Sequence, residues 1–225
     1  MPDVYSSSKA THPLDTFYAR RGLILPPCQM IEGPDVPEPY RTLLVHENDM
    51  TPTLEQFHGG SVHLRVLGRE RQDNQYLREV VLQLEGTERP VEFGVIRIDL
   101  SLFAAAVRGQ ILREQWPLGH ILRDYVVPHL CRPGAFLRMA SDPLINSILD
   151  LTGARTLYGR RNTILDRSER PLAEIVEILP PAPSGLSAAP AKASNRKTPT
   201  EGVQVTGSDH STRNGENRNG QPRKL

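Results

Sequence analysis

An arginine inside an apolar strand pattern is the first candidate for binding chemistry. In residues 74–84, alternate side chains share one side of a predicted strand, and Arg78 lies on the same side as Val80 and Leu82. A guanidinium keeps its charge, and burying that charge is costly unless an anion meets it. Arg78 therefore lies at the sheet edge, pairs with a structural carboxylate, or binds an anionic ligand such as a carboxylate, which fits its planar fork.

Two glutamates interrupt a second apolar strand pattern near the end of the domain. In this last predicted strand, Glu174 lies on one face and Glu177 on the other, each among aliphatic side chains. A carboxyl group in an apolar pocket has a raised pKa and can donate or exchange a proton near neutral pH. The alternative is a salt bridge from either glutamate to Arg160, Arg161 or Arg78.

The sequence contains no further catalytic or metal-binding motif. The G-x-S-x-G, Walker, glycine-rich dinucleotide, H-x-x-x-H and C-x-x-C patterns are all absent. The histidines are scattered, and the two cysteines, Cys28 and Cys131, lack metal-ligand spacing. We therefore expect reduced thiols, no metal and no cofactor.

Charge and composition predict a soluble protein. The 225 residues carry a formal net charge of +1, which gives no indication of binding to nucleic acid or to an anionic membrane. The first residues lack an apolar signal core, and no apolar run approaches membrane-spanning length. We expect a cytoplasmic monomer.

Hydrophobic periodicity predicts one α+β domain built on an antiparallel sheet. Strands are predicted at 62–66, 74–84 and 90–98, joined by tight turns into a meander, and at 156–165 and 171–179 as a closing hairpin. Helices are predicted at 49–59, 100–116, 120–126 and 143–149, with strand and loop at 128–138. Residues 26–39 read as a proline-rich loop. Residues 1–13 and the basic tail 182–225 are expected to be disordered, which leaves 14–181 as the domain.

Short motifs in a fixed order resemble a known enzyme family. The motifs are Asn48-Asp49-Met50-Thr51, Tyr76-Leu77-Arg78-Glu79-Val80-Val81-Leu82, Trp116-Pro117-Leu118-Gly119 and Tyr158-Gly159-Arg160-Arg161, followed by Glu177-Ile178-Leu179-Pro180. Together they resemble the chorismate pyruvate-lyase (4-hydroxybenzoate synthase) family, over residues 14–181. The resemblance implies a chorismate lyase-like fold, in which helices pack on an antiparallel sheet around a buried ligand cavity.

The resemblance also implies an activity and a set of site residues. The activity is the cofactor-free conversion of chorismate to 4-hydroxybenzoate and pyruvate, in ubiquinone or aromatic secondary-metabolite biosynthesis. In this family the strand arginine grips the ring carboxylate, which matches Arg78, and the closing-strand glutamate contacts the ring hydroxyl, which matches Glu177. Met50 and Leu118 match residues that complete the pocket. The stretch before Glu177 is slightly longer here than in the bacterial lyases, so Glu174 remains a competitor.

Chorismate needs little chemical activation, because losing its enolpyruvyl group aromatises the ring. A lyase then mainly holds the substrate in a reactive conformer and assists proton transfer. Arg160 or Arg161 is the candidate to meet the enolpyruvyl carboxylate. Two alternatives stay open: a lyase-like enzyme acting on a related aromatic or cyclohexadiene carboxylate, and a small-molecule-sensing domain related to the effector domains of transcription regulators.

Overall fold

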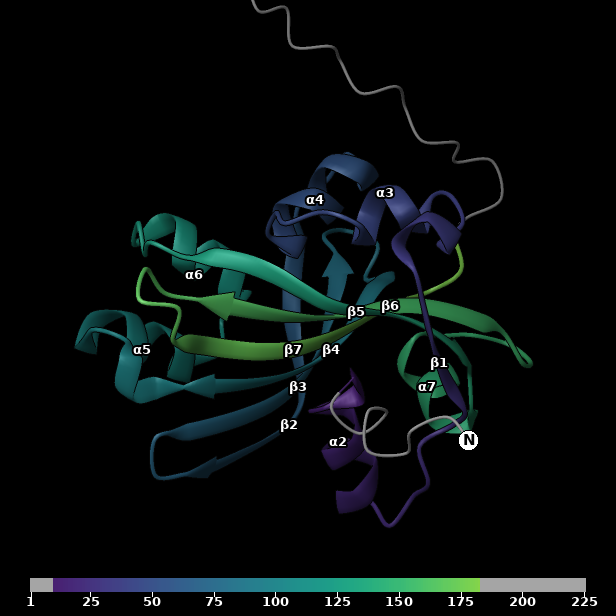
Figure 1. Ribbon diagram of the computed structural model, residues 1–225, viewed down its shortest axis with the longest axis horizontal. Helices are drawn as coiled ribbons and strands as arrows, with labels where there is room; N and C mark the ends of the chain where they lie inside the picture. Colours follow the sequence, from purple (N-terminus) through teal and green to yellow (C-terminus); the bar gives the residue numbers. More distant parts are fainter. Residues whose placement is uncertain (1–9, 183–225) are drawn as a thin grey trace, which may run out of the picture. The chain divides into compact units, whose positions relative to one another are not determined.

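The computed structural model describes residues 10–182, and a seven-stranded antiparallel sheet lies at its centre (Figure 1). The strand order is β1-β5-β6-β7-β4-β3-β2. The strands are β1 (Cys28–Ile31), β2 (Val62–Gln72), β3 (Gln75–Leu84), β4 (Pro90–Asp99), β5 (Leu130–Ala140), β6 (Thr156–Leu165) and β7 (Pro171–Leu179). Both the predicted meander, β2-β3-β4, and the closing hairpin, β6-β7, are present.

Six α-helices accompany the sheet within the described residues. They are α2 (Leu14–Arg20), α3 (Tyr40–Leu44), α4 (Met50–His58), α5 (Ala105–Arg113), α6 (Leu118–Asp124) and α7 (Pro143–Ile148), with 3-10 turns at Gly33–Asp35 and Leu100–Leu102. The predicted α+β fold class is therefore confirmed. In residues 10–182, no helix is both long and apolar enough to cross a membrane. Disorder was predicted for residues 1–13 and 182–225, of which 1–9 and 183–225 lie outside the described residues. Residues 10–13 are described, and Ala10 is buried in the same apolar cluster as Phe17 of α2.

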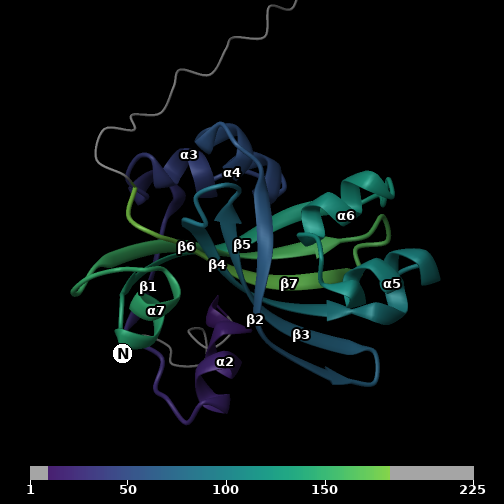
Figure 2. The same ribbon diagram turned by 180° about the vertical axis from the view of Figure 1, so that it is seen from behind.

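Apolar side chains cover both faces of the sheet, and a different set of helices packs on each face (Figures 1 and 2). On one face, α2 and α7 contribute Phe17 and Ile145, which pack in one cluster with Phe93 and Val176 of the central strands. On the other face, α5 and α6 form one cluster with β4 and β7, and α3 and α4 form another. Burial of each large aliphatic or aromatic side chain contributes about 1.5–3 kcal/mol, so both layers stabilise the sheet.

An ion pair between a partly exposed arginine and a buried glutamate fixes α2 to the sheet. The guanidinium of Arg21, just after α2, donates to both carboxylate oxygens of Glu79 on β3, at 3.0 and 2.6 Å. Such a bidentate contact is the strongest form of this interaction. Glu79 follows Arg78 in the strand and points to the opposite face, so it cannot neutralise its neighbour.

The register of the central strands gathers the charged residues on the face below α4 and α6. Residues directly opposite each other in neighbouring strands share a face. Gly94 of β4 lies between Val80 of β3 and Glu177 of β7, and Glu92 lies opposite Leu82. The alternation predicted for residues 74–84 is therefore confirmed in β3. Both Arg78 and Glu177 belong to this face of the sheet.

The predicted turn at 68–74 is wrong, because β2 continues to Gln72. Residues up to Gln72 pair with β3, and the chain reverses at Asp73, whose φ is 54°. β2 is an edge strand of the sheet. Polar side chains such as Arg69 and Glu70 are exposed there, as an edge strand permits. The run of polar residues was therefore wrongly interpreted as a turn.

The helix predicted at 100–116 is wrong in its limits. Leu100–Leu102 form a 3-10 turn, α5 begins at Ala105, and Glu114 ends it in the left-handed region, with φ at 58°. The helix predicted at 120–126 begins earlier, because α6 starts at Leu118 directly after Pro117, a place where proline costs no hydrogen bond.

The loop predicted at 26–39 is wrong in part, because it contains a strand. Residues Cys28–Ile31 form β1, which pairs with β5 at the other edge of the sheet. The prolines at 26 and 27 precede this strand, and those at 34, 37 and 39 follow it. The strand is only four residues long, which is too short for its periodicity to be recognised between prolines.

Gly159 permits the close approach of β6 and β7 beside the charged face. A Cβ at this position would lie 2.4 Å from the carbonyl oxygen of Glu177 and 2.6 Å from Cδ1 of Ile178. Backbone cannot move away cheaply, so Gly159→Ala should reduce the free energy of unfolding by about 1–3 kcal/mol in a urea titration. Gly60→Ala is the control, because a Cβ there would have no atom within 4 Å. Equal losses in the two variants would contradict the steric account.

Candidate functional site

A small cavity lies between the charged face of the sheet and the first residues of α4 and α6. Its volume is about 60 Å³. The strands contribute Arg78, Glu92 and Glu177 to its wall, and the helices contribute Met50 and Leu118. Four of the residues implied by the family resemblance therefore line one cavity, together with one residue that sequence reasoning missed.

Arg78 is a buried cation without a protein partner for two of its nitrogens. Its residue is 2% exposed, and its Nε and Nη1 atoms have no hydrogen-bond partner among residues 10–182. Burial lowers the pKa of Arg78, and the nearby Tyr76 and Glu114 oppose this shift. An arginine side chain nevertheless stays charged in a protein. The expected position at the sheet edge is excluded by this burial, and the expected structural ion pair is absent from the described part of the chain.

Glu177 is ion-paired, as the structural alternative predicted. Its Oε2 accepts from Nε of Arg160 at 2.5 Å, and the two residues are 3% and 0% exposed. The same guanidinium donates through Nη1 to the carbonyl oxygens of His46 at 2.9 Å and Leu44 at 3.3 Å, and through Nη2 to that of Asn48 at 3.3 Å. Arg160 thus holds Glu177 and the segment leading into α4 together.

Arg161 and Glu174 do not belong to the cavity. Arg161 pairs in register with Val176 on the opposite face, and its Nη2 lies 2.8 Å from Oε1 of Glu174. Glu174 also pairs with Arg97 on β4. Strand alternation explains both positions, because residues adjacent to Arg160 and three places from Glu177 must point to the other face. The structure thus removes Glu174 as a competitor and Arg161 as a ligand for a second carboxylate.

Glu92 is the cavity residue that sequence reasoning missed. It is 4% exposed, and its Oε2 has no hydrogen-bond partner among the described residues. Burial, followed by the charge of Glu177, raises its pKa well above the usual value, while Arg160 opposes the shift. Strand alternation could have identified Glu92 from the sequence. Glu92 shares its predicted strand face with Gly94 and Ile96, just as Arg78 shares its face with Val80.

The raised pKa of Glu92 makes stability depend on pH. At a pH above 4.5, which is the ordinary pKa of a glutamate, the folded chain keeps a proton on Glu92 that the unfolded chain has released. Because the folded state then binds more protons, this group lowers the free energy of unfolding as the pH rises through that window. The melting temperature of Glu92→Gln should therefore exceed that of the parent protein by more at pH 8 than at pH 5. Glu85→Gln, at an exposed turn, is the control. A difference that does not change with pH would contradict the neutral state of Glu92.

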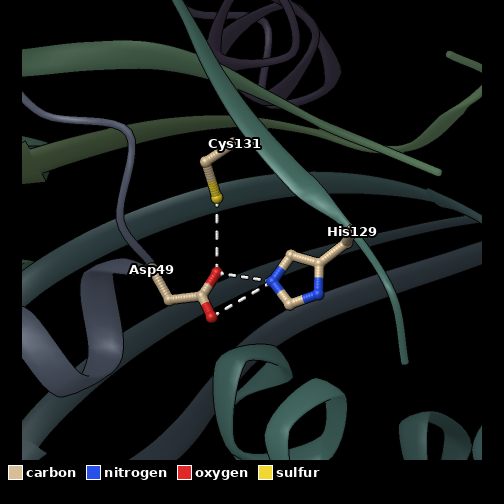
Figure 3. Close-up of side chains that lie close together, drawn as sticks. All are labelled: Asp49, His129 and Cys131. Atoms are coloured by element: carbon tan, nitrogen blue, oxygen red, sulfur yellow. Dashed lines mark hydrogen bonds and ion pairs between the residues drawn. The ribbon is translucent and has the colours of Figure 1, made fainter. Parts of the chain in front are cut away.

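A second group of polar side chains lies beside the cavity (Figure 3). Nε2 of His129 is 3.0 and 3.1 Å from the two carboxylate oxygens of Asp49, and Sγ of Cys131 is 3.3 Å from Oδ1. Burial raises the pKa of the Cys131 thiol to about 12. The hydrogen bond to Asp49 raises the pKa of His129, and the pKa of Asp49 is lowered because His129 outweighs the opposing effect of burial.

Comparison with known proteins gives likeness in structure only. No protein-family model and no curated protein matches the sequence. PhnF from Mycobacterium smegmatis is 9% identical, with 60% of this chain and 64% of that chain covered and a TM-score of 0.45. The C-terminal domain of the histidine utilization repressor from Pseudomonas syringae pv. tomato is 11% identical, with 53% and 92% covered and a TM-score of 0.38.

A GntR-family transcriptional regulator from Bacillus cereus gives a similar result. It is 10% identical, with 53% of this chain and 92% of that chain covered and a TM-score of 0.36. Likeness at this level does not assign a function to this chain.

Proposed function

We propose that this domain binds a small cyclic carboxylate in the cavity below α4 and α6. The observation that carries the proposal is the pair of unpartnered nitrogens of Arg78 at the cavity wall. A buried guanidinium without a counter-ion is costly, and a carboxylate that accepts from two of its nitrogens offsets that cost. The remaining wall is mostly aliphatic, with Val80, Leu82 and Ile175, which favours a ring over a polar chain.

The far wall of the cavity favours a hydroxyl group on the ring. Glu92 is neutral and can donate a hydrogen bond, whereas Glu177 is held as a carboxylate by Arg160 and can accept one. A hydroxyl both donates and accepts, so it satisfies the two glutamates together. The ligand class that results is a hydroxylated ring carboxylate, with its carboxylate at Arg78 and its hydroxyl at the glutamates.

Two functions could use such a pocket. The geometry favours binding without turnover over catalysis. Glu177 is held in place by its ion pair with Arg160, so its carboxylate is positioned to accept from a hydroxyl. This favours a small-molecule-sensing domain. The second candidate is elimination of pyruvate from chorismate, which is supported by the presence of Met50, Arg78, Leu118 and Glu177 in one cavity. In that case Arg78 orients the ring carboxylate and the neutral Glu92 is available for proton transfer.

Calorimetric titration with 4-hydroxybenzoate, benzoate and 4-hydroxybenzyl alcohol tests the proposal. We expect 4-hydroxybenzoate to bind best, benzoate more weakly because the glutamates lose their partner, and the alcohol least because Arg78 loses its anion. Incubation with chorismate, followed by a coupled assay for pyruvate, then separates the candidates. Pyruvate release at a rate above the spontaneous one selects the lyase, and binding without release selects the sensor. Equal affinity for all three ligands would refute the proposed cavity.

A further inference from the structure

Three groups with metal-binding chemistry converge outside the carboxylate cavity. Asp49, His129 and Cys131 each offer one ligand atom, and these atoms all lie within 4.8 Å of one another. Asp49 immediately precedes α4, whereas His129 and Cys131 come from the start of β5 (Figure 3). Some 80 residues separate Asp49 from the other two, so no local sequence motif predicts the cluster.

The donor atoms and their separations suit zinc. Imidazole, carboxylate and thiolate are the usual ligands of zinc, and tetrahedral bonds of about 2.0–2.3 Å place donor atoms roughly 3.5 Å apart. Nε2 of His129 lies 3.0 Å, and Sγ of Cys131 3.3 Å, from Oδ1 of Asp49. Small side-chain movements therefore open the cluster enough for an ion. A carboxylate, a thiolate and a neutral imidazole also balance the two charges of the metal.

The orientation of the ligands is fixed in the way that metal sites require. Nδ1 of His129 lies 2.7 Å from the carbonyl oxygen of Val127, to which it donates, so Nε2 is the nitrogen that faces the cluster. A backbone acceptor behind the imidazole is a common support for metal-binding histidines. Asp49 occupies the N-cap position of α4, yet its side chain makes no capping hydrogen bond, and it points to His129 and Cys131 instead (Figure 3).

The open side of the cluster faces a second cavity. This cavity has a volume of about 460 Å³, and its wall includes all three residues together with Glu47 and Gln56. Three protein ligands with an accessible fourth position are the arrangement of zinc sites that bind water or a small ligand. Asp49 lines the carboxylate cavity as well, so it is shared by both sites.

We propose that Asp49, His129 and Cys131 bind one zinc ion whose fourth coordination position is open to the larger cavity. The ion joins the start of α4 to the start of β5, and through Asp49 it fixes one wall of the carboxylate cavity. This inference goes beyond the proposed function and differs from the metal-free site expected from sequence.

The test uses the full chain, treated with a chelator, dialysed, and titrated with zinc chloride or cobalt chloride. We expect about one ion per chain and, with cobalt, a thiolate-to-metal charge-transfer band in the near ultraviolet. Cys131→Ser should lose this band and bind zinc at least about tenfold more weakly, and His129→Ala should weaken zinc binding to a similar extent. Cys28→Ser is the matched control, because Cys28 is the other free thiol and pairs in register with Met139, at the opposite end of β5 from Cys131.

The competing explanation is a hydrogen-bonded triad that needs no metal. It predicts that zinc affinity is the same in the parent protein, Cys131→Ser and His129→Ala, or that the cobalt band survives in Cys131→Ser. Either result overturns the proposal. Circular dichroism of the metal-free variants checks that each is folded, and His129→Ala serves as the independent ligand deletion if Cys131→Ser does not fold. Failure here leaves binding of the carboxylate at Arg78 unaffected, so the two proposals are tested separately.

Discussion

Replacing Arg78 with alanine should weaken binding of 4-hydroxybenzoate by about 2–4 kcal/mol, which is about 30- to 1,000-fold in Kd. The reason is that a charge-assisted contact through two nitrogens disappears, and no other cation lines the cavity among residues 10–182. Arg78→Lys should recover little of the loss, because an ammonium group is a point charge and cannot reproduce the planar fork. Isothermal titration calorimetry of the two variants measures both effects.

The same variants should change stability only slightly, or raise it. In the absence of ligand, Arg78 is a buried cation for which no ion pair exists in the described part of the chain, and removing such a charge relieves a desolvation cost. Arg97→Ala is the matched control, since Arg97 lies on the neighbouring strand with its side chain partly exposed and paired with Glu174. It should leave both affinity and melting temperature nearly unchanged. Strong destabilisation by Arg78→Ala with unchanged ligand affinity would show that Arg78 is structural.

Replacing Arg160 with methionine should reduce the free energy of unfolding by about 3–5 kcal/mol. The substitution leaves Glu177 buried without its counter-charge, and it also removes the donor that the carbonyl oxygens of Leu44, His46 and Asn48 share. The first consequence acts on β7, and the second acts on the segment that leads into α4. Urea denaturation, followed by circular dichroism, measures the loss.

Comparison with two further variants isolates the charge effect. Arg160→Met combined with Glu177→Leu should be more stable than Arg160→Met alone, because an apolar pair carries no uncompensated charge. Arg161→Met is the control, because Arg161 pairs with Glu174 on the other face, where both side chains retain solvent contact, and it should cost about 1 kcal/mol or less. A double variant that is as unstable as Arg160→Met would show that the backbone contacts of Arg160 dominate.

Strand periodicity located part of the site because it depends only on neighbouring residues. Alternation put Arg78 among aliphatic residues and separated Glu174 from Glu177, and the structure has each on the face that alternation requires. The same logic applied to the strand after Pro90 would have identified Glu92. Alternation also requires Arg160 and Arg161 to point to opposite faces of the sheet, in agreement with the hypothesis that one of the two meets a second carboxylate.

Contacts between distant segments were beyond the reach of such patterns. Arg160 donates to carbonyl groups more than 110 residues earlier, and Asp49 meets His129 across 80 residues. Neither contact has a local signature, because each depends on how α4 is placed on the sheet. The polar end of β2 was misread for a related reason: whether a strand lies at an edge is a property of the whole sheet.

The contact between α4 and α6 has a consequence for the rate of ligand exchange. Oγ1 of Thr51 lies 2.9 Å from the place that a Cβ on Gly119 would occupy, so the first turns of the two helices close the cavity with nothing larger than glycine between them. The cavity volume of about 60 Å³ is well below the roughly 300–1,000 Å³ of most ligand pockets, so these turns must separate before a ring carboxylate enters. In stopped-flow mixing, the observed association rate constant should therefore level off at high ligand concentration, at the rate of helix separation and far below the diffusion limit. Gly119→Ala should shift that plateau, because its methyl group forces the two turns apart.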